Sequence, residues 1–275
     1  MIEPQFNPDE IRFRASGIYH ICTHLEKITA KQLETIAELE QKDKMTLRQN
    51  QIYDGLIVKR YAPDKLPSGA ITHLYDIYDS HVYGIREDIG GKQIDKGNLC
   101  EQDSLDLIKP YFGFLPKNVD TFEKGLIVGT PDALTSDMVI DTKTSWNLRT
   151  WRAAELTALY EWQLHAYMYL TDRNKAVLAY CLVDTPLELI NDEVKRQTFY
   201  KGVIDETSDE FYAIEEQVTR NMYYSDRIPA KNRVKFFQID RDEKKIEAMK
   251  RRSKMGLEKL KEIHESELNY KPELK

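Results

Sequence analysis

Cysteine is scarce in this chain of 275 residues, which contains only Cys22, Cys100 and Cys181. Their odd number and wide separation argue against a disulfide framework and favour reduced thiols, as in a cytoplasmic protein. The spacing also lacks the close groups of cysteines that bind zinc or an iron–sulfur cluster. A metal site built on cysteine is therefore not expected.

Long apolar runs and a leader segment are missing as well. No stretch of about eighteen apolar residues occurs, so no transmembrane helix and no membrane partner are expected. The N-terminal residues MIEPQF lack both a basic segment and an apolar core, so no signal peptide is expected. With 41% hydrophobic and 31% charged residues, the composition predicts an ordinary globular protein, which these absences place in the cytoplasm.

Positive charge is not in excess, because 40 Lys and Arg residues stand against 46 Asp and Glu residues, a net charge of −6. Phosphate-binding proteins tend to be basic, so this balance counts weakly against nucleic acid as a partner. Net charge averages the whole surface, however, whereas a DNA enzyme needs only a local basic groove and bound metal.

Three hydrolase motifs are absent too: Gly-x-Ser-x-Gly, a Walker loop and His-Glu-x-x-His.

The hydrophobic patterning predicts an α/β or α+β fold with a central mixed β-sheet flanked by helices. A largely helical N-terminal region over 1–95 is expected before a core with a C-terminal helix over 96–275, and together they are expected to form one compact domain. The expected elements are exposed helices within 27–59, a helix over 98–109, a hairpin over 121–144, a helix over 151–171, a buried strand over 176–183, helices over 187–200 and 207–225, a strand over 234–240 and a terminal helix over 241–267.

Three charged residues in the predicted hairpin carry most of the functional signal. Asp132 follows an apolar stretch, and Asp141 and Lys143 follow a short polar break and the pair Val139-Ile140. Residues two apart in a strand share a face, so Asp141 and Lys143 project together, and Asp132 can turn toward the same spot. Asp and Lys in hairpins are usually solvated surface residues. Two carboxylates and an ammonium on a rigid sheet nevertheless suit a hard divalent cation and an activated water.

Two further segments point to the same site. Glu101 lies in the first turns of a predicted helix, where a carboxylate could equally complement the helix dipole. Gln163 and Tyr167 are four residues apart and share one face of a predicted helix. That face could turn toward the hairpin, or it could simply bury a tyrosine that needs a hydrogen-bond partner.

The order of these segments resembles the PD-(D/E)XK nucleases, in particular the branch with phage lambda exonuclease, the YqaJ-type viral recombinases and the RecB nuclease domain. The resemblance covers roughly residues 95–240 and implies a restriction-endonuclease-like core. It rests on Glu101, Gly129-Thr130-Pro131-Asp132, Ile140-Asp141-Thr142-Lys143, Gln163 and Tyr167. Asp141 departs from the Glu that the exonucleases often carry there, and residues 27–95 have no counterpart in the family pattern.

The resemblance implies Mg²⁺ or Mn²⁺ as the cofactor. Asp132 and Asp141 would ligate the ion, helped by the backbone carbonyl of Thr142, and Glu101 would complete its inner or outer shell. Lys143 would orient or deprotonate the attacking water and stabilise negative charge in the transition state. Phosphodiester hydrolysis needs those same functions, which a carboxylate-bound cation and a lysine supply together.

The remaining roles follow from the same resemblance. Gln163 would position Lys143 or the scissile phosphate, and Tyr167 would support that helix face. Two segments are candidates for DNA binding. Trp146, Arg149 and Arg152, directly after the strand with Asp141 and Lys143, could stack on bases and bind phosphates, although the tryptophan could equally pack in the core with the arginines at the surface. Arg12, Arg14 and Ser16 resemble the segment that grips the terminal 5′ phosphate in these exonucleases.

The favoured function is a metal-dependent deoxyribonuclease, most plausibly an exonuclease on linear double-stranded DNA in phage or mobile-element recombination. An endonuclease of the same superfamily and a non-catalytic DNA-binding protein with this fold are the alternatives. DNA is the expected partner, in a bacterial or phage-infected cell. A single-strand annealing recombinase and a ring-shaped homo-oligomer are further candidates that only the resemblance suggests.

Overall fold

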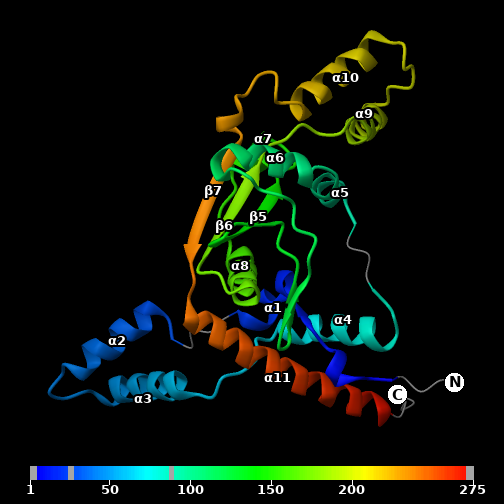
Figure 1. Ribbon diagram of the computed structural model, residues 1–275. Coiled ribbons are helices and arrows are strands. Elements are labelled where there is room, and N and C mark those ends of the chain that lie inside the picture. Colours follow the sequence, from blue (N-terminus) through cyan, green and yellow to red (C-terminus); the bar gives the residue numbers. More distant parts are fainter. Residues whose placement is uncertain (1–4, 24–27, 87–89, 271–275) are drawn as a thin grey trace. The chain divides into compact units, whose positions relative to one another are not determined.

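The computed structural model describes residues 5–23, 28–86 and 90–270 of the chain (Figure 1). Up to the first long loop of the core, the elements are η1 (Pro8–Glu10), β1 (Phe13–Arg14), η2 (Ala15–Gly17), α1 (Tyr19–Cys22), α2 (Ala30–Glu40), α3 (Leu47–Tyr61), α4 (Ala70–Val82), α5 (Lys92–Leu99) and α6 (Glu101–Phe112), where η denotes a 3-10 helix. The later elements are β2 (Phe122–Lys124), β3 (Ile127–Gly129), β4 (Ala133–Leu134), β5 (Met138–Thr144), α7 (Leu148–Arg152), α8 (Ala158–Thr171), β6 (Lys175–Cys181), α9 (Leu187–Lys201), α10 (Asp209–Met222), η3 (Ala230–Asn232), β7 (Val234–Asp240) and α11 (Glu243–Leu268).

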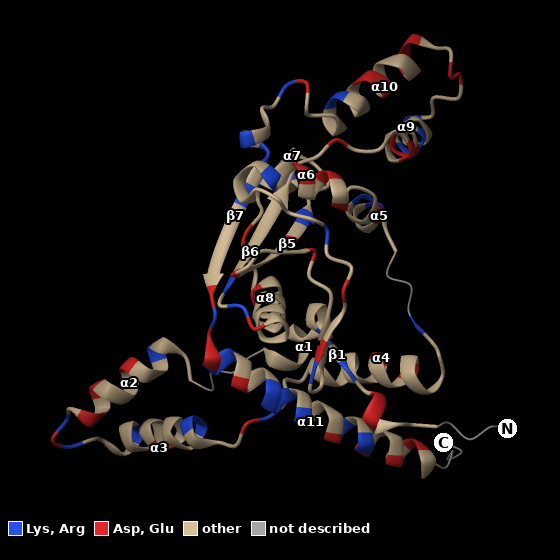
Figure 2. Ribbon diagram, viewed as in Figure 1, with Lys and Arg blue, Asp and Glu red and all other residues tan. Residues whose placement is uncertain are grey.

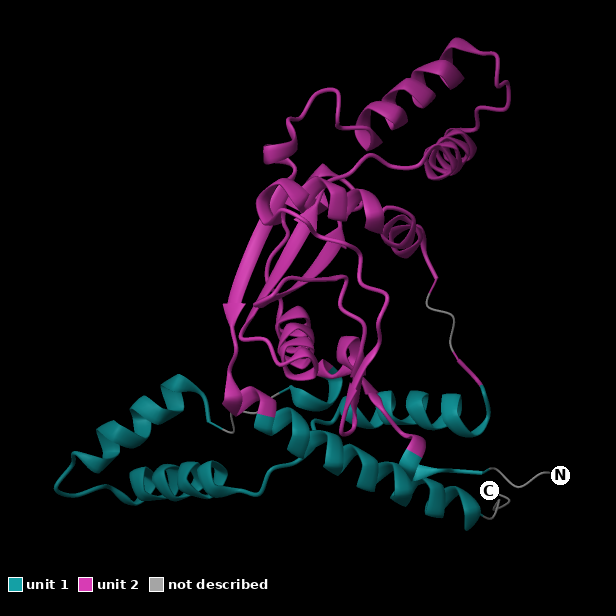
Figure 3. Cartoon of the chain, in the orientation of Figure 1, with its two compact units in different colours: residues 1–9, 20–84, 247–275 teal, residues 10–19, 85–246 magenta. Residues whose placement is uncertain are grey.

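The chain forms two compact units, each built from separate stretches of sequence (Figure 3). Unit 1 consists of residues 1–9, 20–84 and 247–275, and unit 2 consists of residues 10–19 and 85–246. The division at residue 95 and the single compact domain expected from the sequence both stay predictions. Unit 2 contains every described strand and every predicted site residue.

Unit 1 is helical. Thr29 and Thr46 begin α2 and α3 with capping boxes, in which a threonine side chain and a glutamine three residues later satisfy each other's backbone N–H groups. These are the two exposed helices predicted within 27–59. Along α11, basic and acidic side chains alternate and form ion pairs three residues apart, such as Lys259–Glu262 at 2.8 Å (Figure 2). Such alternation of charges is typical of a solvated helix face.

Unit 2 is built on a four-stranded sheet with the strand order β4-β5-β6-β7, in which β5 and β6 are parallel and the outer pairs are antiparallel. A smaller sheet has the order β1-β3-β2. Helix α6 packs against β5 and β6, and α8 packs against the same two strands. The predicted mixed sheet flanked by helices is therefore confirmed, as is the buried central strand, which is β6.

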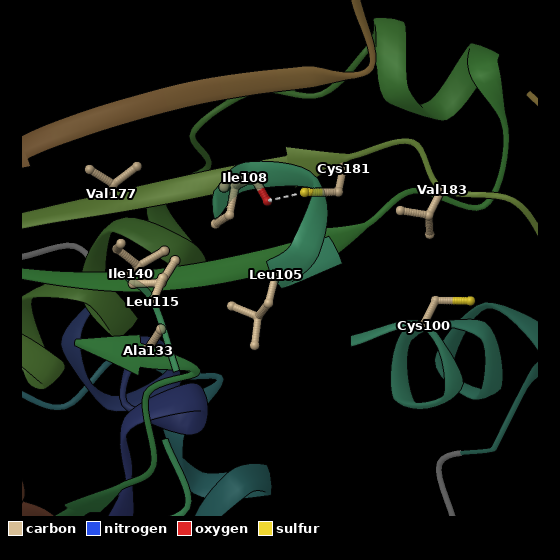
Figure 4. Packing of buried hydrophobic residues seen from close by; sticks show 10 residues of the cluster. Cys100, Leu105, Ile108, Leu115, Ala133, Ile140, Val177, Cys181 and Val183 are labelled. Atoms are coloured by element: carbon tan, nitrogen blue, oxygen red, sulfur yellow. Dashed lines mark hydrogen bonds between the residues drawn. The ribbon is translucent and has the colours of Figure 1, made fainter. Parts of the chain in front are cut away.

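The alternation of side chains along β5 and β6 gives the sheet two different faces. One face packs into a buried cluster with Leu105 and Ile108 of α6, and its sheet residues include Ile140, Val177 and Cys181 (Figure 4). Asp141 has the opposite parity to Ile140, so it belongs to the other face, where α8 lies. The polar residues of β5 thus meet a helix that can supply partners.

Three predicted elements differ from those observed. The helix expected over 98–109 is interrupted, because α5 ends at Leu99 and α6 runs from Glu101 to Phe112. The hairpin over 121–144 is in fact two antiparallel pairs, β2–β3 and β4–β5, which belong to different sheets. Pro131 lies between them, and proline cannot donate to a strand ladder. The helix over 151–171 is divided into α7 and α8, because Thr157 adopts an extended backbone and caps α8 through its side chain.

The structure shows the state of the cysteines and the character of the helices among the described residues. Cys22, Cys100 and Cys181 are all buried and free. Within the described ranges, no helix combines the length and the apolar character needed to cross a bilayer.

Candidate active site

Strand register brings the two carboxylates of the candidate site together. In the antiparallel β4–β5 pair, Ala133 is opposite Ile140 and Leu134 is opposite Val139. Extending this register by one residue places Asp132, which directly precedes β4, opposite Asp141. Residues opposite each other in such a pair have Cβ atoms about 4.5–5.5 Å apart. The two aspartates therefore meet although eight residues separate them.

The Asp132 carboxylate is held by the strand across from it. Its Oδ2 atom accepts hydrogen bonds from the backbone N–H of Thr142 at 2.6 Å and from the Thr142 hydroxyl at 2.7 Å. Burial, followed by the neighbouring Asp141 carboxylate, raises the pKa of Asp132 from 3.8 to about 6. A buried pair of like charges is unfavourable without a cation.

Asp141 is almost fully buried, with 2% of its surface exposed, and contacts α8. Its Oδ1 atom accepts a hydrogen bond of 3.4 Å from Gln163 Nε2, which also donates to the Tyr167 hydroxyl at 2.9 Å. Burial, and then the Asp141 charge, raise the pKa of Tyr167 above its ordinary value. The structure thus turns the predicted Gln163/Tyr167 face toward β5.

Lys143 supplies the positive charge of the site. Its Nζ atom lies 2.7 Å from Asp141 Oδ2, and a quarter of its side chain is exposed. Burial opposes the charged form, but the carboxylates of Asp141 and then Asp132 outweigh it and raise the pKa of Lys143 above its ordinary value. Apart from this ion pair, buried Asp141 Oδ2 has no hydrogen-bond partner.

Glu101 does not join the two aspartates. It is the first residue of α6, and its Oε2 atom pairs with Lys117 Nζ at 2.9 Å. Lys117 forms a β-bridge with Ala133, the residue after Asp132, so Glu101 lies in the neighbourhood of the site. No three His, Cys, Asp or Glu side chains gather into a metal-binding group in the described parts of the chain. The role of Glu101 in a metal shell remains a prediction.

The residues present nevertheless fit a hard divalent cation. Asp132 and Asp141 provide two adjacent carboxylates, and Asp141 Oδ2 is a buried oxygen without a hydrogen bond. Mg²⁺ commonly uses only one or two protein carboxylates and keeps several waters. When bound there, the ion would supply Lewis acidity and neutralise developing negative charge. The Thr142 carbonyl is the further predicted ligand.

The candidate DNA-binding residues differ in their exposure and in their contacts. Arg12 pairs with Glu123 at 2.6 Å, whereas Arg14 and Ser16 are exposed. Trp146 is partly buried and packs against the apolar residues shared by α9 and α10, and its role in DNA binding stays a prediction. Two exposed arginines lie on α7, namely Arg149 and Arg152.

Sequence reasoning missed one aromatic residue beside the site. Lys143 Nζ lies 5.0 Å from the ring centroid of Tyr160, at the start of α8. The available signal was its position three residues before Gln163, which places both on one helical face.

We expect Asp132→Asn to stabilise the metal-free protein by about 1–3 kcal/mol at pH 7. Asparagine keeps an oxygen for the two Thr142 donors but removes a buried charge. Because the pKa of Asp132 is raised from 3.8 to about 6, the folded wild type binds more protons than the unfolded chain between these values. Its stability relative to the variant should therefore fall as pH rises from about 4 to about 6.

Urea denaturation in EDTA across this pH range measures the difference. A variant less stable than the wild type at pH 7 would contradict the expectation. Adding Mg²⁺ should then raise the Tm of the wild type and leave that of Asp132→Asn almost unchanged, since the variant lacks one ligand.

Comparison with known proteins supports the architecture. No family model matches the sequence, and no curated protein matches it. The structure is similar to that of a phage-related exonuclease from Haemophilus somnus 129PT, with a TM-score of 0.64, 20% identity, and coverage of 94% of this chain and 97% of that one. It is also similar to an alkaline exonuclease from Laribacter hongkongensis, with a TM-score of 0.52, 13% identity, and coverage of 94% and 91%. The chain therefore shares its overall fold with these two exonucleases.

Proposed function

We propose that this protein is a metal-dependent DNA nuclease, and that it acts as an exonuclease on linear double-stranded DNA. The observation that carries the proposal is the convergence of Asp132, Asp141 and Lys143, with Gln163 donating to Asp141 from α8. These residues occupy the motif positions of a nuclease family, within a fold shared with two exonucleases.

The charges of the site suit phosphodiester hydrolysis. Such hydrolysis needs an activated water and groups that stabilise negative charge as it develops on the phosphate. The carboxylates would hold Mg²⁺ or Mn²⁺, and the Lys143 ammonium would contact the water or a phosphate oxygen. Since its Nζ atom lies 2.7 Å from Asp141 Oδ2, Lys143 would orient or deprotonate the attacking water beside the ion.

The exonuclease mode and the biological setting are inferred from similar structures and from the family resemblance. The endonuclease alternative uses the same chemistry and differs in how DNA enters, while the binding-protein alternative needs no intact charged set. Two similar structures are exonucleases, and one is phage-related, which favours the exonuclease and a role in phage or mobile-element recombination. A recombinase partner and a ring-shaped oligomer are proposed from the family resemblance alone.

Purified protein should degrade linear duplex DNA in Mg²⁺ or Mn²⁺ and not in EDTA, while closed circular duplex DNA stays intact. The two substrates can be prepared from one plasmid, with and without a 5′ phosphate on the linear form, and followed on gels. Nicking of the circles would instead establish an endonuclease. Binding without cleavage of either substrate, with metal present, would favour the non-catalytic DNA-binding protein.

A further inference from the structure

The ammonium group of Lys143 has two neighbours. One is Asp141 Oδ2, at 2.7 Å. The other is the Tyr160 ring, whose centroid is 5.0 Å from Nζ, within the range of a cation–π interaction. The ring is therefore a second constraint on the position of Nζ, in addition to the carboxylate.

Tyr160 is itself held in place by two elements. It belongs to the first turn of α8, where its backbone N–H donates to the capping Thr157 hydroxyl at 3.5 Å. Its ring contacts that of Tyr180 edge-on, with the centroids 6.2 Å apart. Tyr180 is the residue paired with Lys143 in the parallel β5–β6 ladder, and its hydroxyl donates to the Glu155 carbonyl at 2.9 Å. A helix start and a neighbouring strand therefore fix the ring beside the lysine.

A lysine head group on a four-carbon stem has considerable rotational freedom, and an ion pair to one carboxylate lets it pivot. An aromatic face attracts the ammonium but has no oxygen or nitrogen atom that accepts a hydrogen bond from it. The N–H groups can therefore donate to a water or a phosphate oxygen. We propose that Tyr160 is a positioning residue of the proposed nuclease, whose ring holds the Lys143 ammonium for reaction. This inference rests on the proposed function, and the ring face rather than the hydroxyl performs the role.

The decisive variants are Tyr160→Leu and Tyr160→Phe. Loss of the ring in Tyr160→Leu should lower kcat on linear DNA about 3- to 30-fold, the span of a cation–π contact, with little change in KM. Tyr160→Phe should recover most of this loss, because its ring face still attracts a cation. Equal losses in both variants would assign the effect to the hydroxyl and overturn the proposal.

Tyr169→Leu is the matched control. Tyr169 lies on the same helix, and Lys124 Nζ lies 5.1 Å from its ring centroid, so the contact is of the same kind but involves other residues. This variant should keep the wild-type kcat. Thermal unfolding of all three variants checks that each is folded at the assay temperature.

A measurement that needs no catalysis separates this inference from the proposed function. Acetylation by acetic anhydride, followed by peptide mass spectrometry, reports access to Lys143, with Lys124 as an internal reference. Tyr160→Leu should speed acetylation of Lys143 about threefold or more, whereas Tyr169→Leu should affect only Lys124. Unchanged Lys143 acetylation in Tyr160→Leu would overturn the positioning role. A wild type that cleaves no DNA would refute the nuclease while leaving this result interpretable.

Discussion

Replacing Lys143 with alanine is expected to lower the rate of metal-dependent DNA hydrolysis by roughly 100- to 1,000-fold. The variant loses the cation that lies beside Asp141 and that would face the developing negative charge of the phosphate. Single-turnover cleavage of linear duplex DNA at saturating Mg²⁺ measures the chemical step without product release.

Lys124→Ala is the control for this experiment. Lys124 also combines a carboxylate partner, Asp172 at 2.5 Å, with a tyrosine ring, so the substitution removes similar contacts from another place. Circular dichroism at the assay temperature shows whether Lys143→Ala is folded, since Asp141 is left buried without its cation. Undiminished cleavage by a folded Lys143→Ala would refute the catalytic assignment.

Replacing Gly129 with alanine is expected to destabilise the protein by about 3 kcal/mol, the upper end of typical overpacking costs. A Cβ atom at Gly129 would lie 2.8 Å from Ala15 Cβ and 2.8 Å from Tyr167 Cε1, closer than such atoms approach. Ala15 is fully buried, so its side chain has no open space to move into. Displacement of Tyr167 would also disturb Gln163, so cleavage should fall as well.

The matched control is Gly97→Ala in α5, where nothing lies within 4 Å of an added Cβ atom. That substitution should stabilise the protein by about 0.5–1 kcal/mol, because alanine favours helix more than glycine does. Urea denaturation of both variants gives the comparison. A Gly129→Ala variant as stable as the wild type would show that β3 and α8 can separate without cost.

Much of the fold was predictable because its elements have strong local signals. The apolar run over 176–183 indicated the central strand β6, and threonines three residues before a glutamine began α2 and α3. The break between α7 and α8 was missed because apolar residues continue across it. Only the extended backbone of Thr157 shows where the second helix begins.

The sequence alone determined which residues of the site share a face. Alternation along a strand placed Asp141 beside Lys143, and helical spacing placed Gln163 beside Tyr167, since both depend only on local backbone geometry. Tertiary structure decided which of these groups meet. Strand register set Asp132 opposite Asp141, and packing of α8 brought Gln163 and Tyr160 to β5. Glu101 pairs with Lys117.

The physical reason is that these last contacts join residues far apart in the chain. Their energies depend on burial, charge and available partners in the folded protein, which no short window of sequence contains. Trp146 illustrates this, because a tryptophan among arginines could stack on DNA or fill a core, and its packing against the apolar residues of α9 and α10 is visible only in the folded protein.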